Sequence, residues 1–221
     1  MNRILTIDCW GTLIKGSPDK ERIIYIVAKR LRVDFTALKV AIINVDRELS
    51  PTLHKITQYE YWLAVSKTIK DTDGTTIDPL VAMLKYNEVF EEYEPACINV
   101  DAWRNVISKA IAQGYKIRIL SNVGYLRSHQ LEELINRTFR FRDYIRVVGS
   151  DLVNEAKPSK EFYTKALPMF NKDEDIWIHI GDNEELDIKP VQELGGTAVK
   201  FVGWDTFDKV DITSILLAED E

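Results

Sequence analysis

The chain has 221 residues, of which 45% are hydrophobic and 29% are charged, with a formal net charge of −6. This composition supports a sizeable buried core and excludes disordered and fibrous classes, and the length fits one core plus a smaller insertion, because domains average about 150 residues. The acidic balance, with a pI near 5.3, disfavours broad contact with nucleic-acid phosphates, which would need a clustered Lys and Arg surface, so no nucleic-acid partner is expected.

The N-terminus gives no sign of export or membrane insertion. The apolar run before Asp8 covers only residues 4–7, whereas a signal-peptide core needs about 7–15 residues, and no window approaches the roughly 18 apolar residues of a membrane span. We therefore expect a soluble cytoplasmic protein with no membrane partner. Cys9 and Cys97 are expected to be reduced thiols, because one pair without an export signal makes no disulfide framework.

The first predicted element is a strand over residues 3–7 that leads into Asp8. A loop containing Gly11 and Thr12 follows at once. In parallel α/β sheets ligands bind outside the carboxyl ends of the strands, and such a loop offers backbone N–H groups and a hydroxyl to an anion. Asp8 is therefore a candidate nucleophile. Strand alternation points Cys9 away from the side that Asp8 and Trp10 share, so Cys9 is expected to be buried and structural.

The region that follows is predicted to be entirely helical. Turn and breaker residues at 50–51 and 72–74 divide it, and the expected helices cover residues 20–31, 35–49, 57–69 and 79–92. The simplest account is an insertion of residues 15–94 into a core that consists of residues 1–14 and 95–221.

An aromatic cluster lies in this insertion, formed by Tyr59, Tyr61 and Trp62. We expect these side chains to pack the helical domain. One of them could instead line a binding pocket, and helical spacing does not decide between these roles.

Strands and helices alternate through the rest of the chain. Apolar runs rich in β-branched residues predict strands at 116–120, 145–148, 176–180 and 198–202. Helical patterns cover 101–113, 124–137, 159–170 and 184–194. Asp101 suits an N-cap of the first of these helices and Gly114 its C-terminal stop. This alternation predicts a parallel α/β sheet with right-handed crossovers.

Polar residues follow the predicted strands where they end. Ser121 and Asn122 follow the second strand, Lys157 comes after the third, and Asp182 and Asp187 come after the fourth. The carboxyl ends of parallel strands share one sheet edge, where these residues meet Asp8. Several carboxylates at one edge make a hard oxygen site of the kind that Mg²⁺ prefers.

The order Asp8, Ser121, Lys157 and Asp182 resembles the haloacid dehalogenase superfamily, in particular its members with a helical cap of the C1 type. The resemblance implies a Rossmann-like, doubly wound parallel sheet with residues 15–94 as the cap. It also implies that Asp8 attacks phosphorus or carbon to give a covalent aspartyl intermediate. Ser121 and Lys157 would complete the catalytic set.

A magnesium ion is part of what the resemblance implies. Its ligands would be the carboxylates of Asp8 and Asp182 and the backbone carbonyl of Trp10. Asp187 would support the site through water or Lys157.

The resemblance also implies a phosphate site, in which Gly11, Thr12, Ser121, Asn122 and Lys157 would hold the oxygens. The substrate would then be a small phosphorylated molecule, and selectivity would depend on the cap.

Trp10 departs from the pattern of the phosphatase members, which carry a second Asp there. Three hypotheses remain open. The first is a phosphatase that prefers leaving groups of low pKa, because Trp cannot act as the general acid. The second is a 2-haloacid dehalogenase, since those enzymes carry an aromatic residue at this position. The third is a binding protein of the same fold that has lost its chemistry.

The three histidines are not expected to bind a metal or to catalyse. His54 and His129 are predicted to lie on the surface or in the cap, and His179 in a buried strand. No Cys lies at zinc-ligand spacing from any of them.

Overall fold

The computed structural model describes residues 1–15, 20–49, 52–53, 55–92, 99–123 and 126–203. The chain divides into two compact units: residues 1–16, 96–123 and 128–221 form the α/β unit, and residues 17–95 and 124–127 form the helical unit. His54 and Cys97, like the predicted domain boundary at residue 95, lie outside the described residues.

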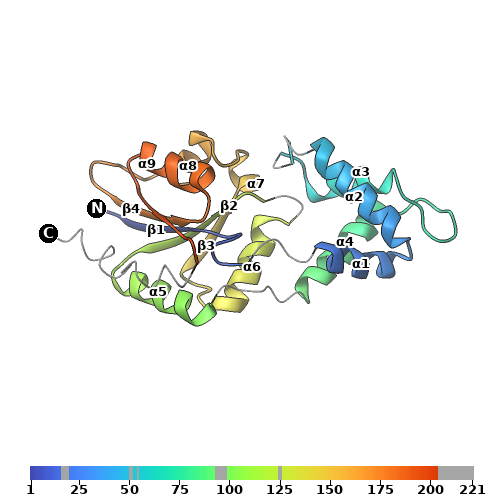
Figure 1. Cartoon of the computed structure of the whole chain (residues 1–221), viewed down its shortest axis with the longest axis horizontal. Helices are drawn as coiled ribbons and strands as arrows, with labels where there is room; N and C mark the ends of the chain where they lie inside the picture. The colour runs from blue at the N-terminus through green and yellow to red at the C-terminus, as the bar shows by residue number, and fades with distance from the viewer. Residues whose placement is uncertain (16–19, 50–51, 54, 93–98, 124–125, 204–221) are drawn as a thin grey trace. The chain divides into compact units, whose positions relative to one another are not determined.

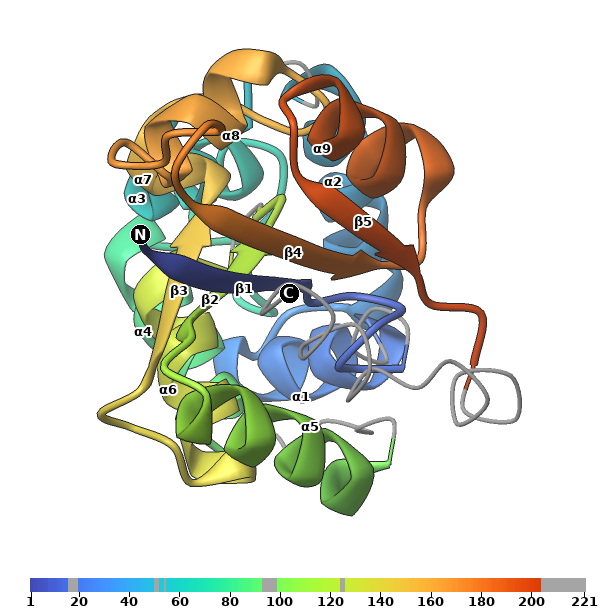
Figure 2. The ribbon, with the colours of Figure 1, turned by 90° about the vertical axis from the view of Figure 1, so that its left-hand side faces the viewer.

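A five-stranded parallel sheet forms the centre of the α/β unit, in the order β3-β2-β1-β4-β5 (Figures 1 and 2). The strands are β1 (Arg3–Asp8), β2 (Lys116–Ser121), β3 (Ile145–Gly149), β4 (Ile176–Gly181) and β5 (Thr197–Lys200). The predicted doubly wound α/β class is therefore confirmed. Because the chain runs outward from β1 to β3 and then returns to β4, the strand order reverses between β1 and β4, where such sheets bind ligands.

Helices cover both faces of this sheet. The helices of the unit are α5 (Val100–Ala112), α6 (Ser128–Phe139), α7 (Ser150–Val153), α8 (Lys160–Ala166), the single π-turn η1 (Glu184–Ile188) and α9 (Lys189–Glu193). In Figure 1, α5 and α6 lie on one face, and α8 and α9 lie on the other. Both faces of the central strands are thus buried, which explains their continuous apolar sequences.

The N-cap of α5 differs from its prediction. Asn99 caps the helix, with φ of 45° and its side-chain oxygen accepting a hydrogen bond from Ala102 N at 3.2 Å, and Asp101 lies within the first turn. An Asn tolerates this left-handed backbone better than most residues. The predicted stop at Gly114 is confirmed by its φ of +82°.

Four other segments of the α/β unit differ from their predicted bounds by more than a shift of one residue. The α8 helix ends at Ala166 and not at residue 170, because Pro168 disfavours helical geometry at Leu167. The α6 helix begins at Ser128, whose backbone N–H donates a hydrogen bond to the Asp151 carboxylate. Residues 124–125 of the predicted helix lie outside the described residues. The 184–194 segment divides into η1 and α9, and β5 ends at Lys200.

The helical unit contains α1 (Lys20–Leu31), α2 (Phe35–Leu49), α3 (Gln58–Ser66) and α4 (Pro79–Glu91). Thr57 and Glu60 form a capping box at α3, which satisfies two backbone donors at once. Residues 124–127 join this unit, where the Arg127 guanidinium donates to the carbonyl of Ile56. Within the described residues, no helix has the length and apolar composition needed to cross a bilayer.

The aromatic cluster of the helical unit is partly a packing cluster, as expected. Tyr61 and Trp62 are buried, and the ring of Trp62 lies 5.3 Å from that of Tyr86. Tyr59 is 45% exposed, so the expectation that it packs the domain is wrong. It lies two positions before the buried Tyr61, and residues two apart do not share a helix face.

Candidate functional site

The ends of β1 and β4 bring three carboxylates together where the strand order reverses. Asp8 ends β1, and Asp182 and Asp187 follow β4. An oxygen of each lies within 4.8 Å of the others, an arrangement that could hold a metal ion. Asp8 and Asp187 are buried, whereas Asp182 is exposed to solvent. The donor set fits a hard divalent cation, which accepts carboxylate oxygens and completes its coordination with water.

Lys157 supplies the positive charge of this cluster. Its Nζ donates hydrogen bonds to Asp8 Oδ1 at 2.6 Å and to Asp187 Oδ1 at 2.7 Å. The side chains of Lys157 and Asp187 are each only 2% exposed. A buried ammonium needs such partners, because an unpaired charge in the interior is very costly.

Asn122 positions Lys157 through the backbone. Its side-chain oxygen accepts from Lys157 N at 2.8 Å, and its Nδ2 donates to the Lys157 carbonyl at 3.1 Å. Both polar atoms of the Asn122 amide therefore bond the same residue, Lys157. Sequence reasoning could not see this pairing, because the two residues are far apart along the chain.

A buried hydrogen-bonded chain behind Asp187 was also missed. His179 Nε2 lies 3.4 Å from Asp187 Oδ1, and its Nδ1 lies 2.7 Å from Thr6 Oγ1, which accepts from Trp177 Nε1 at 2.8 Å. Burial lowers the pKa of His179, which favours the neutral ring. The Thr6 hydroxyl accepts from the indole, and its proton can go to Nδ1 or to the Ile178 carbonyl at 3.3 Å. With the proton toward Nδ1, Nε2–H donates to Asp187.

His179 was predicted to be part of a buried strand, and it is fully buried in β4. The sequence did contain a signal that His179 bonds a neighbour of the site. It is a titratable residue within an apolar run, three positions before Asp182, and a buried polar group requires hydrogen-bond partners.

Two glycines leave the space that the carboxylates occupy. A Cβ at Gly11 would lie 2.2 Å from Asp182 Oδ2, and one at Gly181 would lie 2.5 Å from Asp187 Cγ. Gly11 also has a φ of +90°, a conformation that costs other residues energy. Both positions therefore require glycine in this arrangement.

Two predicted phosphate-binding hydroxyls are buried near the strand ends. Ser121 is fully buried, and its Oγ donates to the Asn122 carbonyl at 3.3 Å. Thr12 is also fully buried, and its Oγ1 has no hydrogen-bond partner among the described residues. The Thr12 carbonyl accepts from Trp103 Nε1 at 3.2 Å, which ties the loop to α5. A buried hydroxyl with spare hydrogen-bonding capacity is suited to an incoming oxygen anion.

Opposing charges set the protonation of the cluster. Burial and the negative charges of Asp187 and Asp182 raise the pKa of Asp8 to about 6, against the effect of Lys157. Burial acts to raise the pKa of Asp187, but the hydrogen bond from His179 and the charge of Lys157 lower it to about 2. Burial acts to lower the pKa of Lys157, and the attraction of Asp8 and Asp187 outweighs it, so the pKa is raised. The ammonium therefore stays charged.

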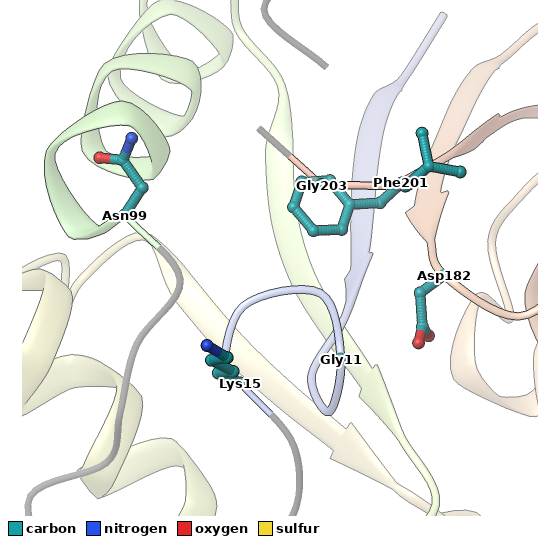
Figure 3. Close-up of a pocket in the computed structure, with 7 residues that line it drawn as sticks. Gly11, Lys15, Asn99, Asp182, Phe201 and Gly203 are labelled. Carbon is teal, nitrogen blue, oxygen red and sulfur yellow. The ribbon is translucent and has the colours of Figure 1, made fainter. Parts of the chain in front are cut away.

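A cavity of about 690 Å³ adjoins the cluster within the α/β unit, and it is lined by Gly11, Lys15, Asn99, Asp182, Phe201, Val202 and Gly203 (Figure 3). Asp182 belongs to both the cavity and the carboxylate cluster. Its volume is in the usual range of small-molecule sites, about 300–1,000 Å³. A substrate in this cavity would therefore reach the cluster.

The comparisons with known proteins agree with this geometry. The family model of haloacid dehalogenase-like hydrolases matches residues 3–195. No curated protein sequence matches the chain.

Solved structures with a similar fold include hydrolases of more than one kind. The HAD hydrolase YfnB from Bacillus subtilis, bound to magnesium, has 18% identity and a TM-score of 0.60, with 95% of this chain and 98% of that chain covered. A HAD family enzyme from Bacteroides thetaiotaomicron, in complex with magnesium and inorganic phosphate, has 18% identity and a TM-score of 0.58, with 96% and 100% covered. A 2-haloacid dehalogenase from Pseudomonas syringae pv. Tomato has 15% identity and a TM-score of 0.57, with 93% and 90% covered.

Replacing Gly11 tests the packing of Asp182 against the loop. Gly11→Ala and Gly114→Ala both place a Cβ at positive φ, but Gly114 has nothing within 4 Å of that Cβ. We expect Gly114→Ala to lower the free energy of unfolding by about 1 kcal/mol and Gly11→Ala by a further 1–3 kcal/mol or so, because the Asp182 carboxylate must move. Urea unfolding of both variants measures the difference, and equal losses would contradict the close packing.

The pKa of Asp8 predicts how stability depends on pH without divalent cations. Folding raises this pKa from its ordinary 3.8 to about 6, so the folded state binds the proton more tightly. The contribution of Asp8 to the free energy of unfolding should therefore be larger at pH 5 than at pH 7, by on the order of 1 kcal/mol. His179 acts in the opposite direction over this range, because burial lowers its pKa, and it does so in wild type and in Asp8→Asn alike. Asp187 adds no change there, because its pKa is lowered and its contribution is lost only in stronger acid. Urea unfolding in EDTA should therefore show that the difference in free energy of unfolding between wild type and Asp8→Asn shifts by this amount in favour of the wild type from pH 7 to pH 5.

Proposed function

The chain belongs to the haloacid dehalogenase-like hydrolases, and from this premise we propose that it is a Mg²⁺-dependent phosphatase of small molecules. The observation that carries the proposal is the cluster of Asp8, Asp182 and Asp187 around the buried Lys157. It combines a nucleophile, a set of hard cation ligands and a fixed ammonium, which together suit phosphoryl transfer.

Asp8 is the nucleophile of the proposed reaction. Lys157 bonds its Oδ1, and within the described part of the chain no hydrogen bond is made to its other oxygen, Oδ2. That oxygen attacks phosphorus, the bond from phosphorus to the leaving oxygen breaks, and an aspartyl-phosphate forms. Water then attacks the phosphorus of this intermediate and restores the carboxylate.

The residues for holding Mg²⁺ are the Asp8 and Asp182 carboxylates and the Trp10 carbonyl. When bound, the ion neutralises phosphoryl charge and orients the substrate. Raised pKa values support the assignment, since burial and neighbouring carboxylates raise the pKa of both Asp8 and Asp182. Such an excess of negative charge favours a divalent cation. Asp187 supports the site by fixing Lys157.

We assign the phosphoryl oxygens to the backbone of Gly11, the hydroxyls of Thr12 and Ser121, and the ammonium of Lys157. The unpartnered Oγ1 of Thr12 supports its place in this set. Asn122 stays a predicted phosphate contact, because its Nδ2 keeps a second N–H, and we assign it a further role, since its amide bonds the backbone of Lys157 through Oδ1 and one N–H. It is a positioning residue for the lysine.

The helical unit is proposed to be the cap that selects the substrate, in an enzyme of the cytoplasm. Its all-helical composition and its insertion after the first strand support this role. With Trp10 in place of a general acid, the enzyme should favour leaving groups that need no proton, such as aryl or acyl phosphates.

A second candidate is C–halogen hydrolysis at a 2-halo acid through an ester of Asp8. The aromatic Trp10 favours it, as does the similarity to a 2-haloacid dehalogenase. Asp182 favours the phosphatase, because it adds a third carboxylate to a cluster that could hold a metal ion. Formation of an ester at carbon does not need such an ion.

Hydrolysis of p-nitrophenyl phosphate by wild type and Asp8→Asn, with Mg²⁺ and with EDTA, tests the proposed reaction. We expect turnover only in the wild type with Mg²⁺. The Asn variant should lose at least about 10³-fold in kcat, since it lacks the nucleophilic oxygen. Asp101→Asn is the matched control, because the Asp101 side chain is 94% exposed on the same unit.

Turnover that persists in EDTA or in Asp8→Asn would contradict the proposal. Halide release from a 2-halo acid in EDTA would favour the dehalogenase. Ligand binding without either reaction would leave a binding protein of this fold.

Restoring an acid at position 10 tests the role assigned to Trp10. Trp10→Asp should raise kcat/KM for an alkyl phosphate such as glycerol phosphate by about 10²-fold or more, with little gain for p-nitrophenyl phosphate, because only the alkoxide needs a proton. Trp10→Asn is the matched control, since it has a similar size without the acid. An equal gain in both variants, or none in a folded Trp10→Asp, would exclude this role.

A further inference from the structure

The cavity beside the carboxylate cluster contains a cation that the proposed reaction does not use. Lys15 lines this cavity together with Gly11 and Asp182. In the view of Figure 3, Lys15 and Asp182 lie on opposite sides of the Gly11 loop. Because both residues line the same cavity, a ligand large enough to span it can contact both.

The turn that leads to Lys15 is held by backbone hydrogen bonds, which fix the point of the chain from which the lysine extends. Ile14 N and Leu13 N both donate to the Cys9 carbonyl at 2.9 Å, and Gly11 N donates to the Ile14 carbonyl at 2.8 Å. Leu13 and Ile14 are buried. Lys15 thus follows directly after a hydrogen-bonded turn that begins at Cys9, next to the proposed nucleophile Asp8.

Lys15 is also the cation of this region that lacks a partner. It is exposed, and among the residues that the structure describes its Nζ makes no hydrogen bond or ion pair. The other lysines near Asp182 are engaged: Lys157 bonds Asp8 and Asp187, and Lys200 pairs with Glu184 at 3.0 Å. A lysine with no protein partner at a cavity wall is available to a ligand.

The charge of the cluster explains why such a cation would be needed. Three carboxylates surround one ammonium, which leaves an excess of two negative charges when all are ionised. One divalent cation balances that excess, and nothing remains to attract a second anionic group on the substrate. Lys15, outside the cluster but in the same cavity, supplies that attraction.

The rest of the lining indicates where the second group would lie. Phe201 and Val202 contribute apolar lining to the cavity, and Asn99 lines it together with Lys15 (Figure 3). An organic leaving group can contact the apolar wall while an anionic substituent on it reaches the ammonium.

We propose that Lys15 forms an anion subsite, so that the preferred substrates are phosphate esters whose leaving group carries a carboxylate or a second phosphate. The inference rests on the proposed phosphatase function. It makes Lys15 a specificity residue of that reaction, in the α/β unit and not in the cap.

Binding of non-hydrolysable phosphonates tests the subsite independently of turnover. Calorimetry in Mg²⁺ compares propylphosphonate, which has one anionic group, with phosphonopropionate and ethylenediphosphonate, which add a carboxylate or a second phosphonate. Wild type should bind one or both of the latter at least about tenfold more tightly than propylphosphonate, corresponding to one charge-assisted hydrogen bond. Their order of affinity identifies the preferred anion.

Variants assign the effect to the lysine. Lys15→Gln should abolish the preference and Lys15→Arg should retain most of it. Lys200→Gln, which removes an equal charge that Glu184 already pairs, should leave it unchanged. Equal affinities in the wild type, no binding at all, or a preference that survives in Lys15→Gln would overturn the proposal.

Kinetics separate this proposal from the proposed function. With phenyl phosphate and para-carboxyphenyl phosphate, Lys15→Gln should raise KM about tenfold for the carboxylated substrate only, with kcat unchanged. If neither ester is hydrolysed but the phosphonate preference depends on Lys15, the phosphatase proposal fails and the subsite stands. If both esters are hydrolysed with equal KM in wild type and Lys15→Gln, the subsite fails and the phosphatase stands.

Discussion

The buried ammonium of Lys157 between Asp8 and Asp187 is the interaction on which the rest of the site depends. It connects the end of β1, the segment before α8 and the turn η1 through two hydrogen bonds shorter than 3 Å. A buried ion pair is weak evidence for stability, because desolvation can exceed the Coulombic gain and an apolar replacement is often as stable. Its value here is geometric: three segments distant in sequence are fixed so that one oxygen of Asp8 stays free to react.

The surrounding residues are arranged to keep this ammonium in place. Asn122 fixes the backbone of Lys157, and His179 fixes Asp187 from the core side. The glycine at position 181 leaves room for Asp187 to approach the strand end. Each of these residues acts on Asp8 only through Lys157 or Asp187, so they form an outer layer that positions the groups of the cluster.

The strand ends and the residues that follow them could be predicted from the sequence, because apolar runs locate buried strands and parallel strands share one edge. The partners of those residues could not. Thr6 meets His179 because β1 and β4 pair in a register that places these two residues side by side, and no local pattern contains that register. The same holds for Asn122, whose amide bonds a residue beyond the next strand. The cap of α5 is a different case, because Asn99 bonds Ala102 three residues further on, and this local signal was overlooked in favour of Asp101. Periodicity gives positions along an element, whereas hydrogen-bond partners depend on the tertiary arrangement.

The two sides of the site are built differently, and this difference bears on how function can vary in such a fold. On the side of the nucleophile, Asp8, Lys157 and Asp187 are buried and bonded to one another, so a substitution there disturbs several partners at once. On the side of the cavity, Lys15 and Asp182 are exposed, and Lys15 can be exchanged with little effect on the packing of the core. Under the proposed function, chemistry is therefore constrained by the interior of the sheet edge, while the charge of the leaving group is recognised by residues that can be substituted singly. Trp10 is partly exposed and lies in sequence between Asp8 and Lys15, so under the same proposal one substitution there changes the proton supply.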